Sequence, residues 1–125
     1  MSEEEAIRST IQTYFDSSFE SSVEKVREAF HPNARITGYV GDEFKEIPLD
    51  DYAKLIGSLQ PSPKEKGETL PTEVLSIEIA GNTAVTRVRD DFQGKTYLDT
   101  LSLVKSDRTW RIYNKLFHIE GDAGR

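Results

Sequence analysis

The sequence predicts an α+β fold in which three N-terminal helices pack in the concave face of a strongly curved, mainly antiparallel sheet. Helical periodicity of apolar residues is confined to residues 1–60, while strand-like runs at about ten-residue spacing fill residues 71–120. These runs share an apolar face, which the preceding amphipathic helices are expected to cover. We therefore expect a single domain over residues 1–120 and a C-terminal tail over residues 121–125.

Composition restricts the class of protein. The chain has 125 residues, 36% of them hydrophobic, and no apolar run approaches the roughly 20 residues of a membrane helix. The net charge of −6 arises in residues 1–50 and disfavours attraction to a nucleic-acid backbone. Cysteine is absent and the acidic N-terminus does not resemble a secretory signal, so we expect a cytoplasmic protein without disulfides.

Capping boxes mark the first two helices. Residues 2–5, SEEE, begin the first helix of about four turns, and Ser21-x-x-Glu24 is expected to begin a short second one. The second helix ends at His31, because the residue before a proline avoids the helical region. The apolar stripes consist of Ile7, Ile11, Tyr14 and Phe15 in the first helix, and of Val23, Val26 and Phe30 in the second.

A third helix is predicted between Asp50, as its cap, and Pro61. Its buried side is formed by Tyr52, Leu55, Ile56 and Leu59.

A small hairpin is predicted between the second and third helices. Its strands are Ile36–Val40 and Phe44–Leu49, with the turn at Gly41-Asp42. Residues 60–70 follow the third helix, contain two prolines and a glycine, and show no apolar periodicity, so we expect a mobile loop there.

The second half of the chain predicts a four-stranded meander. Its turns are expected at Gly81-Asn82, Gln93-Gly94 and Asp107-Arg108. Because the position of a hairpin turn sets the pairing of its strands, these turns fix a register for all four strands. In this register one face collects nearly all of the aliphatic residues, and we expect that face to meet the helices.

Polar residues also fall on the helix-facing side of this register. Asp99, Asn114 and His118 lie there, with Asp90 near the rim. A buried carboxylate takes up a proton, finds hydrogen-bond donors or faces water in a cavity. Two interpretations of Asp99 stand at even weight: it accepts hydrogen bonds from Tyr14 or Tyr52 in a filled core, or it contacts a ligand.

Apolar walls with a few inward polar groups are typical of a small-molecule pocket. The candidate catalytic residues are Asp99 and His118. The candidate ligand-binding residues, which also suit a filled core, are Tyr14, Phe30, Tyr39, Tyr52, Trp110 and Asn114. Two histidines without carboxylates at metal-site spacing give no metal signal, no phosphate-binding loop is present, and we expect neither a metal nor a cofactor.

The opposite face of the sheet carries apolar residues inside a charged rim. This pattern favours an interface, and a homodimer through the sheet is the simplest explanation. The predicted interface residues are Leu98, Tyr113, Phe117, Arg87 and Arg111. A nucleic-acid platform is the rival, and the overall acidity disfavours it.

Three motifs carry a resemblance that covers nearly the whole chain. Phe30-His-Pro-Asn-Ala34, Asp99-x-Leu-x-Leu-x-Lys105 and Trp110-x-Ile-x-Asn-Lys-x-Phe-His118 resemble the putative lumazine-binding branch of the nuclear transport factor 2-like (NTF2-like) superfamily, which includes SnoaL-like proteins, steroid isomerases and scytalone dehydratase. The resemblance implies a conical cavity between helices and sheet and a dimer through the outer sheet face.

The resemblance to individual enzymes of the superfamily is partial. Asp99 and Tyr14 are similar in placement to the oxyanion-hole pair of the steroid isomerases, an arrangement known from that enzyme class. The carboxylate base of those enzymes has no counterpart in residues 34–39, ARITGY. His31 and His118 supply the residue type that scytalone dehydratase uses, although a helix-capping role also suits His31.

Two functions therefore remain open. The first is binding of a small, partly apolar molecule in a cone-shaped cavity, with an isomerase, dehydratase or cyclase type of reaction. The second is a non-enzymatic interaction or scaffold module that uses the outer sheet face.

Overall fold

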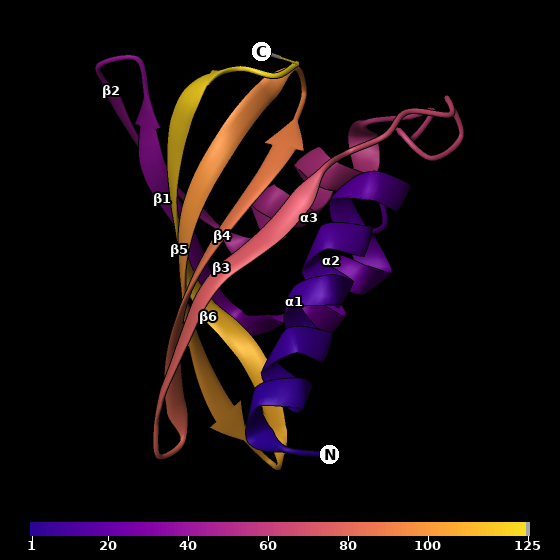
Figure 1. Cartoon of the computed structure of the whole chain (residues 1–125). Coiled ribbons are helices and arrows are strands. Elements are labelled where there is room, and N and C mark those ends of the chain that lie inside the picture. The colour runs from indigo at the N-terminus through magenta and orange to yellow at the C-terminus, as the bar shows by residue number, and fades with distance from the viewer. Residues whose placement is uncertain (125) are drawn as a thin grey trace.

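A computed structural model of the chain describes residues 1–124 (Figure 1). Its helices are α1 (Glu3–Glu20), α2 (Val23–Ala29) and α3 (Leu49–Ser58), all in the first half of the chain. The strands are β1 (Phe30–Val40), β2 (Glu43–Pro48), β3 (Thr72–Ala80), β4 (Thr83–Phe92), β5 (Lys95–Ser106) and β6 (Thr109–Asp122). The predicted α+β fold is confirmed, and the last strand continues two residues into the predicted tail.

The six strands form one curved sheet with the order β2-β1-β6-β5-β4-β3. All neighbouring strands are antiparallel except β1 and β6, which run parallel. The predicted hairpin and all three predicted meander turns are confirmed, since the strands pair around Gly41-Asp42, Gly81-Asn82, Gln93-Gly94 and Asp107-Arg108. The helices lie on one face of this sheet (Figure 1).

Helix α1 begins with the predicted capping box. The Ser2 hydroxyl accepts a hydrogen bond from the Glu5 backbone N–H, and the Glu5 carboxylate accepts one from the Ser2 backbone N–H. The cap of α2 differs from the prediction. Ser22 caps this helix, because Ser21 ends α1 in a left-handed conformation with φ of 50°. Either of the two adjacent serines could cap α2 by its side chain. Because Ser21 is the C-cap of α1, Ser22 is left to cap α2.

Helix α3 begins one residue before the predicted cap. Pro48 is its N-cap and gives no side-chain hydrogen bond, while Asp50 lies inside the first turn, where a carboxylate favours the helix dipole. Tyr52 and Ile56 are buried as predicted, whereas Leu55 is 42% exposed at the edge of the helix.

Residues 60–70, predicted as a mobile loop, make hydrogen bonds to α1 and within the segment. The Lys64 backbone N–H donates to the Phe19 carbonyl of α1 at 2.9 Å. Ser62 is buried, and its hydroxyl and backbone N–H exchange hydrogen bonds with Glu65 as in a capping box. Neither this local turn nor the hydrogen bond to α1 needs apolar periodicity, which is why the sequence pattern missed both.

The main core lies between the helices and the inner face of the sheet. Aromatic rings dominate its centre, where Phe30 packs at 5.7 Å from the ring of Tyr14 and at 5.5 Å from the ring of Tyr52. Within residues 1–124, no helix is long and apolar enough to cross a membrane. The cytoplasmic location stays a prediction.

Candidate functional site

A β-bulge in β6 decides which side chains of this strand point toward the helices. Across the ladder with β5, Leu103 pairs with Ile112 and Ser102 pairs with Asn114, so Tyr113 is an extra residue and the alternation shifts by one. Lys115 therefore faces the helices and is buried, although the regular register places it outside.

The same bulge corrects the predicted positions of three more residues. Phe117 pairs with Asp99 and lies half-buried on the inner side, not on the outer face. Asn114, expected inside, lies on the outer face and donates to the Arg35 carbonyl of β1 at 3.4 Å. His118, also expected inside, pairs with Leu98 on the outer face and is exposed.

Asp99 faces the helices as expected and is fully buried. Its Oδ2 atom accepts a 2.7 Å hydrogen bond from the Tyr14 hydroxyl, while no residue in the range 1–124 donates to its Oδ1 atom. Burial raises the pKa of Asp99, and this effect is partly offset by Lys115 and by the hydrogen bond from Tyr14. Tyr14 keeps its proton, because burial and the charges of Asp90 and Asp99 raise its pKa well above the ordinary value.

Lys115 is the cation next to this acid. Its Nζ atom lies 3.9 Å from Asp99 Oδ2 and 3.5 Å from the Tyr52 hydroxyl. The same atom lies 5.0 Å from the ring centre of Tyr14, 5.1 Å from that of Tyr52 and 5.9 Å from that of Tyr97, which are cation–π distances. An ammonium group has three N–H donors, and none of these contacts is a short hydrogen bond.

The charge state of Lys115 follows from its neighbours. Burial by itself lowers the pKa of Lys115, but the Tyr52 oxygen and the carboxylates of Asp99 and Asp90 outweigh burial and hold the pKa above that of a free lysine. Lys115 is therefore an ammonium ion at neutral pH, and its N–H groups can donate further hydrogen bonds.

Asp90 is the second buried carboxylate. It is 5% exposed, and no residue in the range 1–124 gives its carboxylate a hydrogen bond or an ion pair within 4 Å. Burial raises the pKa of Asp90 to about 7, where attraction to Lys115 is opposed by repulsion from Asp99 and Asp91. We call Tyr14, Tyr52, Asp90, Asp99 and Lys115 the inner polar cluster.

A pocket of about 210 Å³ opens between α3, the β1–β2 hairpin and the β4–β5 turn. We call it the cone pocket. Its walls are aliphatic and aromatic, Tyr52 and Tyr97 belong to them, and its charged lining residues are Lys45 and Lys115. Gly38 shapes it, because a Cβ atom there would lie 2.7 Å from the ring of Phe117, which lines the pocket and packs against β1.

The remaining predicted ligand-binding residues divide into three groups. Tyr14 and Tyr52 belong to the inner polar cluster, and Phe30 packs against both of their rings. Tyr39 is 58% exposed and packs against the ring of Phe44 in the hairpin. Trp110 is buried, but its indole N–H donates to the Glu3 carboxylate at the start of α1, away from the cone pocket.

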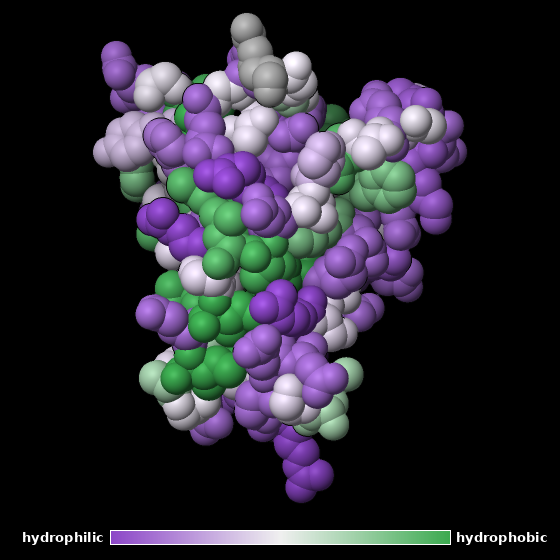
Figure 2. Space-filling model, in the orientation of Figure 1, coloured by the Kyte–Doolittle hydropathy of each residue, from purple (hydrophilic) through white to green (hydrophobic). Residues whose placement is uncertain are grey.

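The outer sheet face keeps most of its predicted interface residues. Arg87 and Tyr113 are exposed, while Leu98 and Arg111 are half-buried. Val85 and Leu116, which the prediction did not include, add exposed apolar surface at 45% and 48%. Figure 2 shows hydrophobic residues gathered over the strands and bordered by polar ones.

Lys115 is the functional candidate that the sequence prediction missed. The signal that could have found it is the charge of Asp99, since a buried carboxylate favours a buried cation nearby. Of the candidates on the neighbouring strand β6, Lys115 is the cation that a one-residue bulge turns inward.

Residues 2–118 match the model of a family described as "Putative lumazine-binding". Among curated proteins, the chain is similar to the aldolase FrzH of Cladobotryum sp., with 32% identity over 119 residues, which cover 94% of this chain and 91% of the relative.

Solved structures share the fold. An NTF2-like protein of unknown function from Methylobacillus flagellatus KT has a TM-score of 0.82 and 27% identity, over 97% of this chain and 96% of the other. An NTF2-like protein of unknown function from Shewanella baltica OS155 has a TM-score of 0.83 and 24% identity, over 96% and 95% of the two chains.

Proposed function

Because the chain belongs to the "Putative lumazine-binding" family of NTF2-like proteins, we propose that its cone pocket binds a small, partly apolar carbonyl compound and promotes chemistry at the carbon next to the carbonyl. The observation that carries this proposal is the Lys115 ammonium group, which lies at an apolar pocket without a short hydrogen bond. Such a group can receive a carbonyl oxygen and stabilise the negative charge of an enolate.

Aldol-type chemistry fits this site and the similarity to an aldolase. An aldol reaction and its reverse pass through an enolate, as do many isomerisations, dehydrations and cyclisations next to a carbonyl. An alternative use of lysine, attack on the carbonyl to form an imine, needs the uncharged amine. The carboxylates that hold Lys115 in its charged form favour the electrostatic role.

Enolate formation also needs a proton acceptor. Asp90 is not part of the lining of the cone pocket but lies next to it, since it pairs across the β4–β5 ladder with Tyr97, which lines the pocket. With a pKa of about 7, Asp90 can accept and release a proton near neutral pH. Asp99 has a different part, because Tyr14 and Lys115 both contact it and it holds the ammonium group in position.

Hydrogen–deuterium exchange tests the proposal without knowledge of the natural substrate. We expect the wild-type protein to accelerate exchange of the protons next to the carbonyl of 4-phenylbutan-2-one in D₂O, followed by proton NMR. Loss of one such group typically costs about 10²–10⁴-fold, so Lys115→Met and Asp90→Asn should each lower the accelerated rate at least tenfold.

A matched variant controls for changes of charge. Lys45→Met also removes a lysine that lines the pocket, but Lys45 is exposed and paired with Glu43, so exchange should stay within about twofold. If the protein bound the ketone but its protons exchanged no faster than in buffer, the proposed reaction would be wrong and only the proposed binding would stand. Absence of saturable binding of the ketone would contradict the proposal as a whole.

The outer sheet face supports a homodimer as the assembly state. Val85, Tyr113 and Leu116 are exposed, and Arg87 and Arg111 lie on the same strands, β4 and β6. No helix covers this face of the sheet (Figure 1). We expect wild-type protein to sediment as a dimer and Leu116→Glu, which places a charge in that apolar centre, to sediment as a monomer at the same concentration. Glu78→Gln, at the periphery of the same face, should leave the mass unchanged. A dimer that survives Leu116→Glu would exclude this face.

A further inference from the structure

A second pocket reaches the inner polar cluster through Asp90. It is a groove of about 260 Å³ between α1, residues 68–72 and the end of β4. Four carboxylates line this acidic groove, and no Lys or Arg does. They belong to Asp16, Glu68, Asp90 and Asp91.

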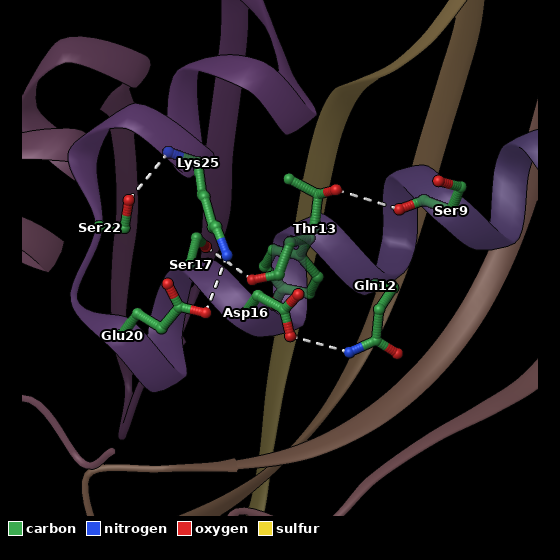
Figure 3. A network of polar contacts seen from close by, with 9 residues as sticks. Ser9, Gln12, Thr13, Asp16, Ser17, Glu20, Ser22 and Lys25 are labelled. Atoms are coloured by element: carbon green, nitrogen blue, oxygen red, sulfur yellow. Dashed lines mark hydrogen bonds and ion pairs between the residues drawn. The ribbon is translucent and has the colours of Figure 1, made fainter. Parts of the chain in front are cut away.

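Three of the four carboxylates already have partners in the protein. Asp16 accepts a 2.9 Å hydrogen bond from Gln12 one turn earlier in α1 (Figure 3). Glu68 pairs with Lys66 at 3.0 Å. Asp91 accepts a 2.7 Å hydrogen bond from the Thr96 hydroxyl.

Asp90 is the exception. It is the most buried carboxylate of the groove, at 5% exposed, and within residues 1–124 no donor lies in hydrogen-bond distance of it. A desolvated carboxylate without donors is unfavourable unless it is protonated or meets a cation. Lys115 attracts Asp90 through space but stays beyond ion-pair distance and contacts Asp99 instead.

The remaining lining of the groove indicates which kind of cation fits. Phe15, Phe19 and Leu70 give it an apolar wall, which suits the carbon atoms of a ligand and, at the ring faces, a cation–π contact. A metal ion fits poorly, because the described residues 1–124 hold no cluster of three His, Asp or Glu side chains that could ligate one.

We propose that the acidic groove is a second binding site, which takes an organic ammonium ion with a short apolar arm and pairs its N–H groups with Asp90. The apolar arm lies against Phe15 and Phe19, and the outer carboxylates attract the charge. We expect the cone pocket to disfavour the same ligand, because the buried charge in its lining is the ammonium group of Lys115.

The walls of the groove are held in place before any ligand binds. The Lys64 backbone N–H donates to the Phe19 carbonyl at 2.9 Å, which ties the loop to α1. The Asp91 backbone N–H donates to the Pro71 carbonyl at 3.3 Å, which ties the other end of the loop to β4. A preformed site loses less conformational entropy on binding.

Binding should depend on pH through Asp90. Its carboxyl loses its proton around pH 7, so affinity for an ammonium ion should rise between pH 6 and pH 8. The charged and titratable groups that act on Asp90 come from every element packed around it: Lys115 from β6, Asp99 and Tyr97 from β5, Asp91 from β4, Tyr14 from α1 and Tyr52 from α3. Asp16 and Glu68 line the groove further out.

A titration with 2-phenylethylammonium, followed by two-dimensional NMR of the wild-type protein, tests this site. We expect saturable shifts at residues of α1 and β4 around the groove, and at least tenfold weaker binding to Asp90→Asn. Asp107→Asn removes the same charge at an exposed turn whose left-handed backbone, with φ of 52°, also suits asparagine. Its affinity should stay within twofold of wild type. The neutral counterpart 2-phenylethanol should bind at least tenfold more weakly than the ammonium ion.

Three results would overturn the proposal. One is an equal loss of affinity in Asp90→Asn and Asp107→Asn, which would indicate attraction to net charge alone. The second is equal binding of 2-phenylethanol, and the third is saturable shifts around the cone pocket in place of the groove. The titration reads binding and not the exchange reaction, so this site can fail while the proposed carbonyl chemistry holds, and the reverse.

Discussion

Lys115→Met should lower the free energy of unfolding by about 3–5 kcal/mol at pH 8, which is the usual effect of removing one partner of a buried ion pair. Methionine keeps most of the volume of the side chain, so packing changes little. The loss arises because Asp99, fully buried, keeps only the hydrogen bond from Tyr14. Urea denaturation of wild type and variant measures the difference.

The pH dependence of this loss has a fixed sign. Burial raises the pKa of Asp99, and Lys115 is the largest influence that lowers it again, so the variant should hold this pKa higher still. A carboxyl group whose folded-state pKa is raised stabilises the fold at low pH and loses that contribution as pH rises through the folded-state pKa. The defect of Lys115→Met should therefore shrink from pH 8 to pH 5.

Two further variants separate charge from packing. Lys115→Met combined with Asp99→Asn removes both charges and should recover much of the lost stability, because a neutral pair no longer needs a counterion. Lys45→Met, at an exposed ion pair, should change stability by less than about 1 kcal/mol. A single variant Lys115→Met as stable as wild type at pH 8 would show that Lys115 does not balance a charged Asp99.

Local signals in the sequence determined most of the fold. The capping box at Ser2 and the turn dipeptides between strands act through neighbouring residues, so each could be recognised without knowledge of the rest of the chain. The shared apolar face of the meander then predicted that the helices cover it, and the resemblance to NTF2-like proteins agreed with this arrangement. The choice between Ser21 and Ser22 as a cap was harder, because it depends on how the preceding helix ends.

The candidate site was predicted only in part, for a physical reason. The inward direction of Asp99 follows from the position of a turn. Tyr14, which donates the hydrogen bond to Asp99, was one of the two donors predicted, the other being Tyr52. The bulge at Tyr113 leaves no comparable trace in the sequence, since one extra residue in β6 changes the pairing only through contacts with β5. Because of that single residue, Lys115 and not Asn114 lies on the inner face, and the proposed chemistry depends on Lys115.

Asp90→Asn should stabilise the protein at pH 8, in contrast to the substitution of Lys115. The pKa of Asp90 is about 7 in the fold and 3.8 in its absence. Between these values the folded state holds a proton that the unfolded state has released, so the contribution of Asp90 to stability falls as pH rises from about 4 to about 7. Asparagine resembles the neutral form at every pH and does not show this fall.

The difference in stability between Asp90→Asn and the wild-type protein should therefore grow with pH. We expect it to be small at pH 4 and to reach on the order of 3 kcal/mol at pH 8, or about 10 °C in melting temperature. Thermal denaturation at pH 4, 6 and 8 measures it, and Asp107→Asn, at an exposed turn, should run parallel to wild type. A difference independent of pH would mean that Asp90 ionises in the fold as it does in the unfolded chain.

Such a result would bear on function as well as on stability. A buried acid that destabilises the fold at neutral pH is a common feature of sites where activity and stability conflict. Because Asp90→Asn should be more stable than wild type, a loss of ketone exchange or of ammonium binding in this variant could not be attributed to unfolding. The same substitution therefore tests whether the carboxylate that weakens the fold is the one that the proposed exchange reaction and the proposed ammonium site both require.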